Sequence, residues 1–586
     1  MRTYIKELLY LLDNDSKKIP WIVLAFLLSS LIDLAGLSII GPYIALIVSP
    51  DVSINENIKV VLSTMGIPNN TDDLIVFLGI GMVFIFLLKT IIGILINKAI
   101  LRFSFNRGMR LQSDLMKAYQ NLPYCDYINR NSSEYVFALQ KLTDLYQNVV
   151  QSTLRLISES IVGLAILIFL FLISGPALGL LIGVLGAAVF TYDIFFKGKV
   201  GQAGIQVNKY SSQIVQGVQE AMSGFKEVRV LHRKEYFYNK VEESASGYAT
   251  AMEKFHLIST IPRYFIELLL VLFLVLMVVG SILVNNNLEA LVPVLAVFGM
   301  AALRLMPSAN MLIDGISKLR YARNGISILY KDYKIFKEKD EIEEDSIRVV
   351  SSSEFQSLSA EGLCFAYPGA LQYSLEDISL QISSGESIGF IGASGSGKTT
   401  LIDVLLGLLS PSSGDIFLNG ESIQENLTKW HSNVAYLPQQ VFLIDSTLES
   451  NITLSAQCDE SKLFSSLKQA RLLDLAESLP DGVKTMIGEN GVRLSGGQRQ
   501  RVALARAFYH GRNVLVMDEA TSALDAQVER EISDEIGRLK GEKTLIIVAH
   551  RITTLKNCDR IYRLADGKIV ECTTYKDICN NEFGTQ

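Results

Sequence analysis

The stretch "GASGSGKTT", residues 392–400, decides the fold of the C-terminal half of the chain. It follows the apolar run "ESIGFIG" and precedes the helix-forming run "LIDVLLGLL". It matches the pattern G-x-x-x-x-G-K-[ST], in which glycines let backbone N–H groups turn toward a phosphate. The helix that follows directs its positive N-terminus at the same anion. A strand, this loop and a helix in that order predict an α/β domain that binds a nucleotide.

The same stretch predicts roles for individual side chains. Lys398 would contact the β- and γ-phosphates, and the hydroxyl of Thr399 would bind Mg²⁺. A chance glycine-rich turn would lack the flanking strand and helix. We expect the following residues of the loop to bind ATP: Gly392, Ser394, Gly395, Ser396, Gly397, Lys398, Thr399 and Thr400.

A second apolar run in this half, "VLVMDEA" (514–520), ends in two carboxylates. Asp518, at the end of the predicted strand, could reach Mg²⁺ through a water molecule. Glu519 could orient or deprotonate the water that attacks ATP. An apolar run ending in Asp-Glu is weak evidence by itself. Downstream of a phosphate-binding loop, it indicates the catalytic end of the same sheet.

The pentapeptide "LSGGQ" (494–498) indicates a family. Together with the phosphate-binding loop, "YLPQQ" (436–440), "SALD" (522–525) and "IVAH" (547–550), it resembles the ATP-binding cassette of ABC transporters. The resemblance covers residues 360–570 approximately, with the motifs in the family's order and spacing. It implies that the protein hydrolyses ATP and uses ATP and Mg²⁺ as cofactors.

The resemblance to ABC transporters also implies roles for single residues. Tyr367 in "FAYPG" matches the aromatic residue that stacks on adenine, and His550 matches the residue that contacts the γ-phosphate. Gln439 matches the residue that links Mg²⁺ and the attacking water to the membrane domain, and Asp525 would lie at a dimer interface. The signature residues would contact ATP held by the other subunit; these are Ser495, Gly496, Gly497 and Gln498. No catalytic position is missing, so two competent ATP sites are implied.

The N-terminal half is built of apolar runs, and 49% of all 586 residues are hydrophobic. A bilayer core requires about 20 apolar residues of helix. Several runs of this length make a soluble protein with buried helices an improbable interpretation. Six predicted membrane helices lie near residues 21–48, 74–96, 157–174, 177–196, 264–284 and 288–306.

The distribution of Lys and Arg predicts the orientation of these helices. Both residue types are concentrated in the N-terminal segment and in the long connections after the second and fourth runs, whereas the alternate connections contain only Lys59. Cytoplasmic loops carry such an excess of cations. We therefore expect a multi-pass membrane protein with both termini in the cytoplasm. The outer segment 55–67 is either a helix on the membrane surface or an ordinary loop helix.

These patterns predict the domain organisation. We expect a transmembrane domain over 1–330, a charged and Ser-rich linker over 331–354 and a nucleotide-binding domain over 355–586. The two long cytoplasmic connections should continue the membrane helices inward. Their tips, 124–137 and 224–237, carry polar and aromatic residues that could dock on a soluble domain. A single cassette cannot close its own ATP site in this family, and six helices are too few to enclose a solute path, so a homodimer is expected.

Charged residues inside the apolar runs suggest a substrate site. In "GMAALRLMPSANML" (299–312), Arg304 would cost about 2.5–3.5 kcal/mol at a helix centre unless it faced a cavity or a partner. Lys89 should lie at similar depth, and Arg263 begins the fifth run at the cytoplasmic side. Snorkelling or pairing with Asp33 would account for one cation. One buried acid cannot neutralise three cations, whereas a diphosphate could, so Lys89, Arg263 and Arg304 are predicted to bind an anionic substrate.

Two short motifs suggest what that substrate is. "RLMPSAN" (304–310), "IPRYFIE" (261–267) and the short outer helix resemble the PglK-type lipid-linked oligosaccharide flippases, which are homodimeric half-transporters. This resemblance implies ATP-driven transfer of a polyprenyl-diphosphate oligosaccharide from the cytoplasmic to the outer leaflet, for protein glycosylation. Alternatives are export of another lipid, a peptide or a hydrophobic drug, and, from another class, an ATP-gated channel. No nucleic-acid partner is expected. The residues alone predict only a cationic cavity.

Overall fold

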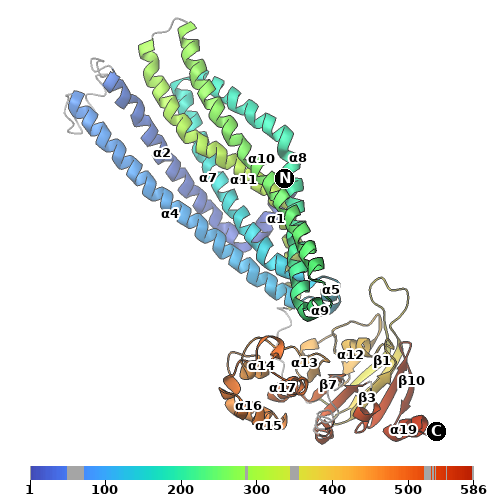
Figure 1. Cartoon of the computed structure of the whole chain (residues 1–586). Coiled ribbons are helices and arrows are strands. Elements are labelled where there is room, and N and C mark those ends of the chain that lie inside the picture. Colours follow the sequence, from blue (N-terminus) through green and yellow to red (C-terminus); the bar gives the residue numbers. More distant parts are fainter. Residues whose placement is uncertain are drawn as a thin grey trace. The chain divides into compact units, whose positions relative to one another are not determined.

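The computed structural model (Figure 1) describes residues 2–48, 71–283, 288–343, 355–519, 530, 534, 536–549 and 551–583. The chain forms two compact units. The first contains Met1–Leu122 and Arg130–Glu343, and the second contains Pro123–Asn129 and Glu344–Gln586. The described part of the first unit is helical, and both sheets belong to the second. The predicted outer segment 55–67 lies outside the described residues.

Long helices make up the first unit, and each predicted membrane run overlaps one of them. They are α2 (Ile19–Val48), α4 (Thr71–Gln120), α7 (Thr143–Ile173), α8 (Gly175–Ser223), α10 (Lys234–Leu283) and α11 (Leu288–Glu343). Shorter helical segments precede or connect them: α1 (Arg2–Leu12), η1 (Asp13–Lys18), α6 (Ser132–Phe137), η2 (Ala138–Leu142) and α9 (Phe225–Val230).

The composition of these helices suits a bilayer. Among the described residues, five segments are long and apolar enough to cross a membrane: Thr3–Ile40, Asp72–Gln120, Ser132–Ile173, Lys234–Gly280 and Val294–Ile335. The predicted run 177–196 lies in α8, where several side chains are outside the description. No side chain is buried in the most apolar part of α4. Ile80 and Phe84, which are 66% and 64% exposed, belong to a surface that suits lipid.

Helix α11 is longer than the sequence analysis expected. It continues to Glu343, through the first part of the segment 331–354 for which we expected a linker. The residues involved, "KDYKIFKEKDEIE", are rich in Lys and Glu, which are good helix formers and can be solvated along the whole surface of a helix. High charge therefore did not indicate irregular structure here. The remainder of the expected linker, 344–354, lies outside the described residues.

The tip of the first long connection belongs to the second unit. It forms the short helix α5 (Tyr124–Ile128), which follows Pro123. The side chains of Tyr124 and Cys125 pack against a hydrophobic core of the second unit. This contact confirms the docking role expected for this tip. The other tip forms α9 in the first unit, where Phe225 and Val230 are exposed.

Two sheets form the second unit. A four-stranded antiparallel sheet has the order β2-β1-β4-β5, and a six-stranded sheet has the order β10-β9-β3-β8-β7-β6, in which only β10 is antiparallel to its neighbour. The strands are β1 (Ser357–Phe365), β2 (Leu375–Ser383), β3 (Ser387–Gly392), β4 (Ser413–Leu418), β5 (Glu421–Ser422), β6 (Val434–Leu437), β7 (Val514–Asp518), β8 (Thr544–Val548), β9 (Arg560–Ala565) and β10 (Lys568–Thr573).

Helices pack around these sheets. They are α12 (Lys398–Leu405), α13 (Leu427–His431), α14 (Leu448–Thr453), α15 (Glu460–Gln469), α16 (Leu473–Ser478), α17 (Gly496–Tyr509) and α19 (Tyr575–Phe583), with short turns η3 (Gly482–Lys484), η4 (Glu489–Gly491) and η5 (Ile552–Leu555). Strands β7 and β8 are buried along their whole length, as central parallel strands should be. Because β3, β8 and β7 are adjacent and parallel, their carboxyl ends bring the phosphate-binding loop close to Asp518.

Candidate functional site

The phosphate-binding loop connects the end of β3 to the start of α12. Gly395 and Gly397 have φ values of 80° and 98°, in the left-handed region that glycine adopts at little cost. A Cβ atom on Gly397 would lie 2.8 Å from the carbonyl oxygen of Ser374. The loop therefore needs glycine at position 397 both for its backbone angle and for the close approach of a neighbouring chain segment.

Two side chains of this loop fit a bound phosphate. Lys398 is only 5% exposed, and its Nζ donates hydrogen bonds to the carbonyl oxygens of Gly392 (3.0 Å) and Ala393 (2.9 Å). The buried hydroxyl of Ser396 has no hydrogen-bond partner within the described structure. A buried ammonium and an unsatisfied hydroxyl at the start of a helix suit an anion better than water. The observed geometry therefore fits the phosphate role predicted for the loop.

Oxygen atoms gather at the carboxyl end of β7. Asp518 is 7% exposed and accepts a hydrogen bond from the hydroxyl of Tyr436 at 3.3 Å. Burial, together with the negative charge of Asp518, raises the pKa of the Asp403 carboxyl to about 6. Carboxylate, hydroxyl and amide oxygens are the ligands that Mg²⁺ takes. The predicted donors Thr399, Gln439 and Asp518 therefore suit this metal.

Asp403 was missed by the sequence analysis. It lies on α12 four residues after Thr399, so both residues lie on the same face of the helix. That spacing was a usable signal, because a carboxylate one turn after the hydroxyl predicted to bind Mg²⁺ lies on the same side of the helix.

Glu519 and Gln439 are in contact, as their predicted roles require. Gln439 Nε2 donates a hydrogen bond to Glu519 Oε2 at 3.0 Å. Glu519 has a φ of 49°, a conformation unfavourable for a residue with a side chain, and its backbone N–H donates to the carbonyl of Val548 at 3.0 Å. Backbone strain of this kind is typical of functional positions. His550 and Asp525 lie outside the described residues.

The signature residues form the N-terminus of α17. Ser495 is the N-cap: its hydroxyl accepts from the backbone N–H of Gln498 (3.3 Å), and its own N–H donates to Gln498 Oε1 (2.8 Å). This capping box holds Gly496 and Gly497 in the first turn, where helix N–H groups have no partner within the helix. The arrangement suits the predicted contact with the γ-phosphate of an ATP molecule that a second subunit holds.

Tyr367 lies at the edge of the nucleotide-binding domain's core. Its ring packs edge-on against Phe365 at 5.0 Å, and its hydroxyl lies 3.3 Å from that of Thr400 in the phosphate-binding loop. The side chain is only partly buried, so part of it is accessible to a ligand. Its position next to the loop is compatible with the adenine-stacking role.

Replacing Tyr367 with Ala should raise the KM for ATP by about tenfold, because stacking of a base on an aromatic ring is worth about 1–3 kcal/mol. Replacing it with Phe should leave KM nearly unchanged, because only the hydroxyl contact with Thr400 is lost. Steady-state ATPase kinetics measure both. Equal KM values for the Ala and Phe variants would contradict the stacking role.

A charge cluster in the first unit includes two of the three predicted substrate residues. Lys89 Nζ lies 2.5 Å from Asp33 Oδ1, and Arg304 Nη2 lies 3.2 Å from Asp33 Oδ2. The Asp33 side chain is only 3% exposed. Helices α2, α4 and α11 thus meet through one carboxylate that bridges two cations.

A second acid completes the cluster. Glu159 on α7 lies 3.4 Å from Arg304 Nη1, and its Oε2 accepts a 2.5 Å hydrogen bond from the hydroxyl of Ser308. Ser308 in turn accepts a hydrogen bond from Arg304 Nη1 at 3.0 Å. Glu159 was not predicted as a site residue, because it lies near the start of the third apolar run, where a charge is expected to be solvated.

Arg263, the third predicted substrate residue, does not join this cluster. Its Nε lies 3.0 Å from Glu267 Oε1, one turn later on α10, and its side chain is 61% exposed. The expected set of three cations is therefore divided in the structure.

The cluster lines a cavity of about 260 Å³. Its charged lining residues are Asp33, Lys89, Arg155, Glu159 and Arg304, with three positive and two negative charges. Arg155 Nη2 donates to Asn97 Oδ1 at 3.0 Å. The cavity predicted as cationic is thus nearly balanced in charge.

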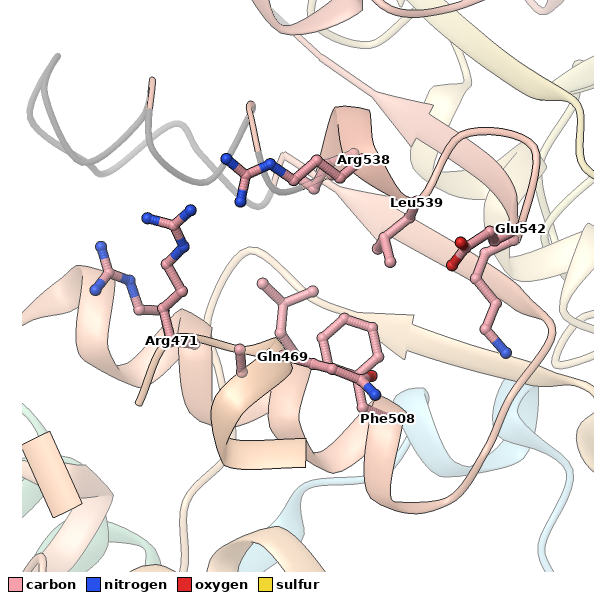
Figure 2. A pocket seen from close by; sticks show the side chains of 11 residues that line it. Gln469, Arg471, Phe508, Arg538, Leu539 and Glu542 are labelled. Atoms are coloured by element: carbon pink, nitrogen blue, oxygen red, sulfur yellow. The ribbon is translucent and has the colours of Figure 1, made fainter. Parts of the chain in front are cut away.

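The second unit contains another pocket, of about 510 Å³. Figure 2 shows Arg471 and Arg538 reaching toward the same side of it, with Phe508 and Leu539 across from them. Gln469 at the end of α15 and Glu542 also line it. None of its lining residues belongs to the phosphate-binding loop, to the end of β7 or to the signature motif. The pocket is therefore separate from the nucleotide motifs.

Comparisons with known proteins agree with this architecture. The family model described as ABC transporter transmembrane region matches residues 21–306, and the model described as ABC transporter matches residues 375–522. The structure of a bacterial Atm1-family ABC exporter with ATP bound superposes with a TM-score of 0.75 at 20% identity, over 97% of both chains.

Curated relatives carry a common description. An ATP-dependent lipid A-core flippase from Ralstonia nicotianae is 29% identical over 83% of this chain and 81% of its own length. The protein of the same description from Hahella chejuensis is 29% identical over 81% of this chain and 80% of its own length. That from Alkalilimnicola ehrlichii is 40% identical over 37% of this chain and 38% of its own length.

The fold and the nucleotide motifs define a membrane transporter of the ABC class, which couples ATP hydrolysis to transport. Within that class, the chain is a half-size exporter, with one transmembrane region followed by one cassette.

Proposed function

We propose that this half-exporter works as a homodimer that uses ATP to move a phosphate-bearing lipid from the cytoplasmic to the outer leaflet of the bacterial inner membrane. The observation that carries the proposal is the cavity among α2, α4, α7 and α11, where Lys89, Arg155 and Arg304 gather. Fixed cations within membrane-spanning helices mark substrate pathways. Guanidinium groups bind phosphate well because they present several donors in one plane.

The homodimer is proposed because the two halves of an ATP site lie on different subunits in this family. In each subunit, Lys398, Tyr367 and the loop glycines would hold one ATP, and Ser495, Gly496, Gly497 and Gln498 of the second subunit would cover it. Thr399, Gln439 and Asp518 would hold Mg²⁺, which when bound neutralises charge on the phosphates. Glu519 would act as the base, and Gln439 and His550 would position the reacting groups.

The orientation follows from the distribution of Lys and Arg in the sequence. Both termini, the cassette and the tip at α5 would lie in the cytoplasm, where ATP is available. ATP binding would draw the two cassettes together and open the membrane path outward. Hydrolysis would reset it, so the lipid would move in one direction.

The cargo that we favour is a polyprenyl-diphosphate oligosaccharide, for use in protein glycosylation. It is supported by the resemblance of residues 261–267 and 304–310 to oligosaccharide flippases and by the suitability of paired cations for a diphosphate. A second candidate, a lipid A-core glycolipid, is supported by the description of the curated relatives. Both cargoes present phosphate next to sugar, so the cavity suits either.

Lipid-stimulated ATPase activity in proteoliposomes separates these cargoes. We expect the protein's cargo, which is one of the two phosphate-bearing lipids, to raise the ATPase rate severalfold and to be flipped. The panel contains a polyprenyl-diphosphate oligosaccharide, a lipid A-core preparation and a neutral glycolipid as the control without phosphate. Stimulation by the neutral glycolipid as strong as that by either phosphate-bearing lipid would contradict the proposal.

A further inference from the structure

The membrane cavity contains two acids that hold the same cations proposed to bind the cargo. We propose that Asp33 and Glu159 are specificity-determining residues: they restrict the cavity to head groups carrying at least two negative charges and so exclude the monoanionic phospholipids of the surrounding bilayer. This inference rests on the proposed function, and it concerns which anions the cavity excludes.

Two cations of the cluster, Lys89 and Arg304, are paired with carboxylates of the protein itself. Lys89 has Asp33 at 2.5 Å, and Arg304 has Asp33 at 3.2 Å and Glu159 at 3.4 Å. The side chains of Asp33 and Glu159 are 3% and 17% exposed. Little water is available to replace a lost partner, so any incoming anion must compensate for each ion pair that it breaks.

The structure indicates which cation can be released. Asp33 bridges Lys89 and Arg304 through different oxygens, so it can keep Lys89 when Arg304 turns away. Glu159 likewise keeps the hydroxyl of Ser308 as a donor. Arg304 Nε is buried and has no hydrogen-bond partner within the described structure, so one donor is available for a ligand. Arg304 is therefore the cation that can exchange its partners.

The charge of the ligand then decides whether it can bind in the cavity. Arg155 also lines the cavity, and it donates a hydrogen bond to the neutral side chain of Asn97. A monoanionic phosphodiester can satisfy Arg155 but cannot also replace the two carboxylates at Arg304. A diphosphate carries at least two charges and several acceptor oxygens, so it can bridge both guanidinium groups. The acids thus set a minimum charge for entry.

Such a threshold is needed in a membrane. Monoanionic phospholipids are abundant there, and a cavity lined only by Lys89, Arg155 and Arg304 would attract them as readily as the cargo. Discrimination between similar ligands often requires an element that repels the wrong one, in addition to contacts with the right one. Asp33 and Glu159 provide that repulsion at the position of the exchangeable arginine.

The test uses Glu159→Gln in the full-length protein in proteoliposomes, with a polyprenyl diphosphate and phosphatidylglycerol as probes. Gln keeps the size of the side chain and an oxygen acceptor for Ser308. We expect the preference of ATPase stimulation and flipping for the diphosphate to fall by about tenfold, because the response to phosphatidylglycerol rises. Asp33→Asn should shift the preference in the same direction, and it serves as the second variant if Glu159→Gln does not assemble.

Asp314→Asn is the matched control. It removes one acid from α11, where Asp314 lies 2.7 Å from Lys318 and both side chains are 45% exposed. Its preference should equal that of the wild type. An unchanged preference in both Glu159→Gln and Asp33→Asn, with basal ATPase activity intact, overturns the inference but leaves the proposed function standing. A wild type that responds to no phosphate-bearing lipid refutes both.

Discussion

Replacing Glu519 with Gln is expected to lower the ATPase rate by about 10²–10⁴-fold, the range in which a positioned general base contributes to catalysis. Glu519 follows the buried strand β7, and its Oε2 accepts a hydrogen bond from Gln439 at 3.0 Å. Gln has the same length but a neutral amide, which cannot take a proton from water. Phosphate release measures the hydrolysis rate, and retention of labelled ATP measures binding.

The same variant should hold ATP between two closed cassettes. The residues that we expect to bind ATP, including Lys398 and Ser495, are unchanged, so affinity for ATP should remain. Glu425→Gln is a suitable control, because Glu425 is exposed and belongs to none of the nucleotide motifs. Hydrolysis by Glu519→Gln within about twofold of the wild-type rate would show that another group is the base.

The local part of the nucleotide site could be predicted from the sequence. A strand, a glycine-rich turn and a helix occur consecutively, so the roles expected of Gly397 and Lys398 follow from neighbouring residues alone. The hydrogen bond between Tyr436 and Asp518 could not be predicted in this way. It depends on β6 lying next to β7, although these strands are far apart in the sequence.

In the membrane domain, the depth of a residue along its helix predicted which cations lie together better than charge alone did. Lys89 and Arg304 were placed at similar depth, and both contact Asp33 in the structure. Arg263 was grouped with them because of its charge, but α10 supplies its own partner at Glu267, four residues later. Helical spacing would have revealed that pair. The contact of Glu159 with Arg304 depends on how α7 packs against α11, which the sequence does not specify.

Replacing Arg304 with Ala is expected to reduce lipid flipping by about 10²-fold or more while ATPase activity remains measurable. Removing one partner of a buried charge pair costs about 2–5 kcal/mol of binding free energy, and every 1.4 kcal/mol is a tenfold change. Arg304 is the cluster's exchangeable cation, since Asp33 can keep Lys89 and Glu159 can keep Ser308. The helices therefore retain contacts in the variant, and the cassette is unchanged. Flipping of a fluorescent polyprenyl-diphosphate lipid and phosphate release, measured on the same proteoliposomes, separate the two activities.

Arg263→Ala provides the comparison that decides between a local site and a general need for positive charge. Arg263 is largely exposed and paired with Glu267 on its own helix, so its loss should reduce flipping far less than the loss of Arg304. If the two variants were equally impaired, the cavity beside Asp33 would not be where the cargo's phosphate binds. If Arg304→Ala flipped lipid at the wild-type rate, Arg304 would only hold the helices together. A parallel loss of ATPase activity would instead indicate that Arg304 supports the structure that transmits nucleotide binding to the membrane helices.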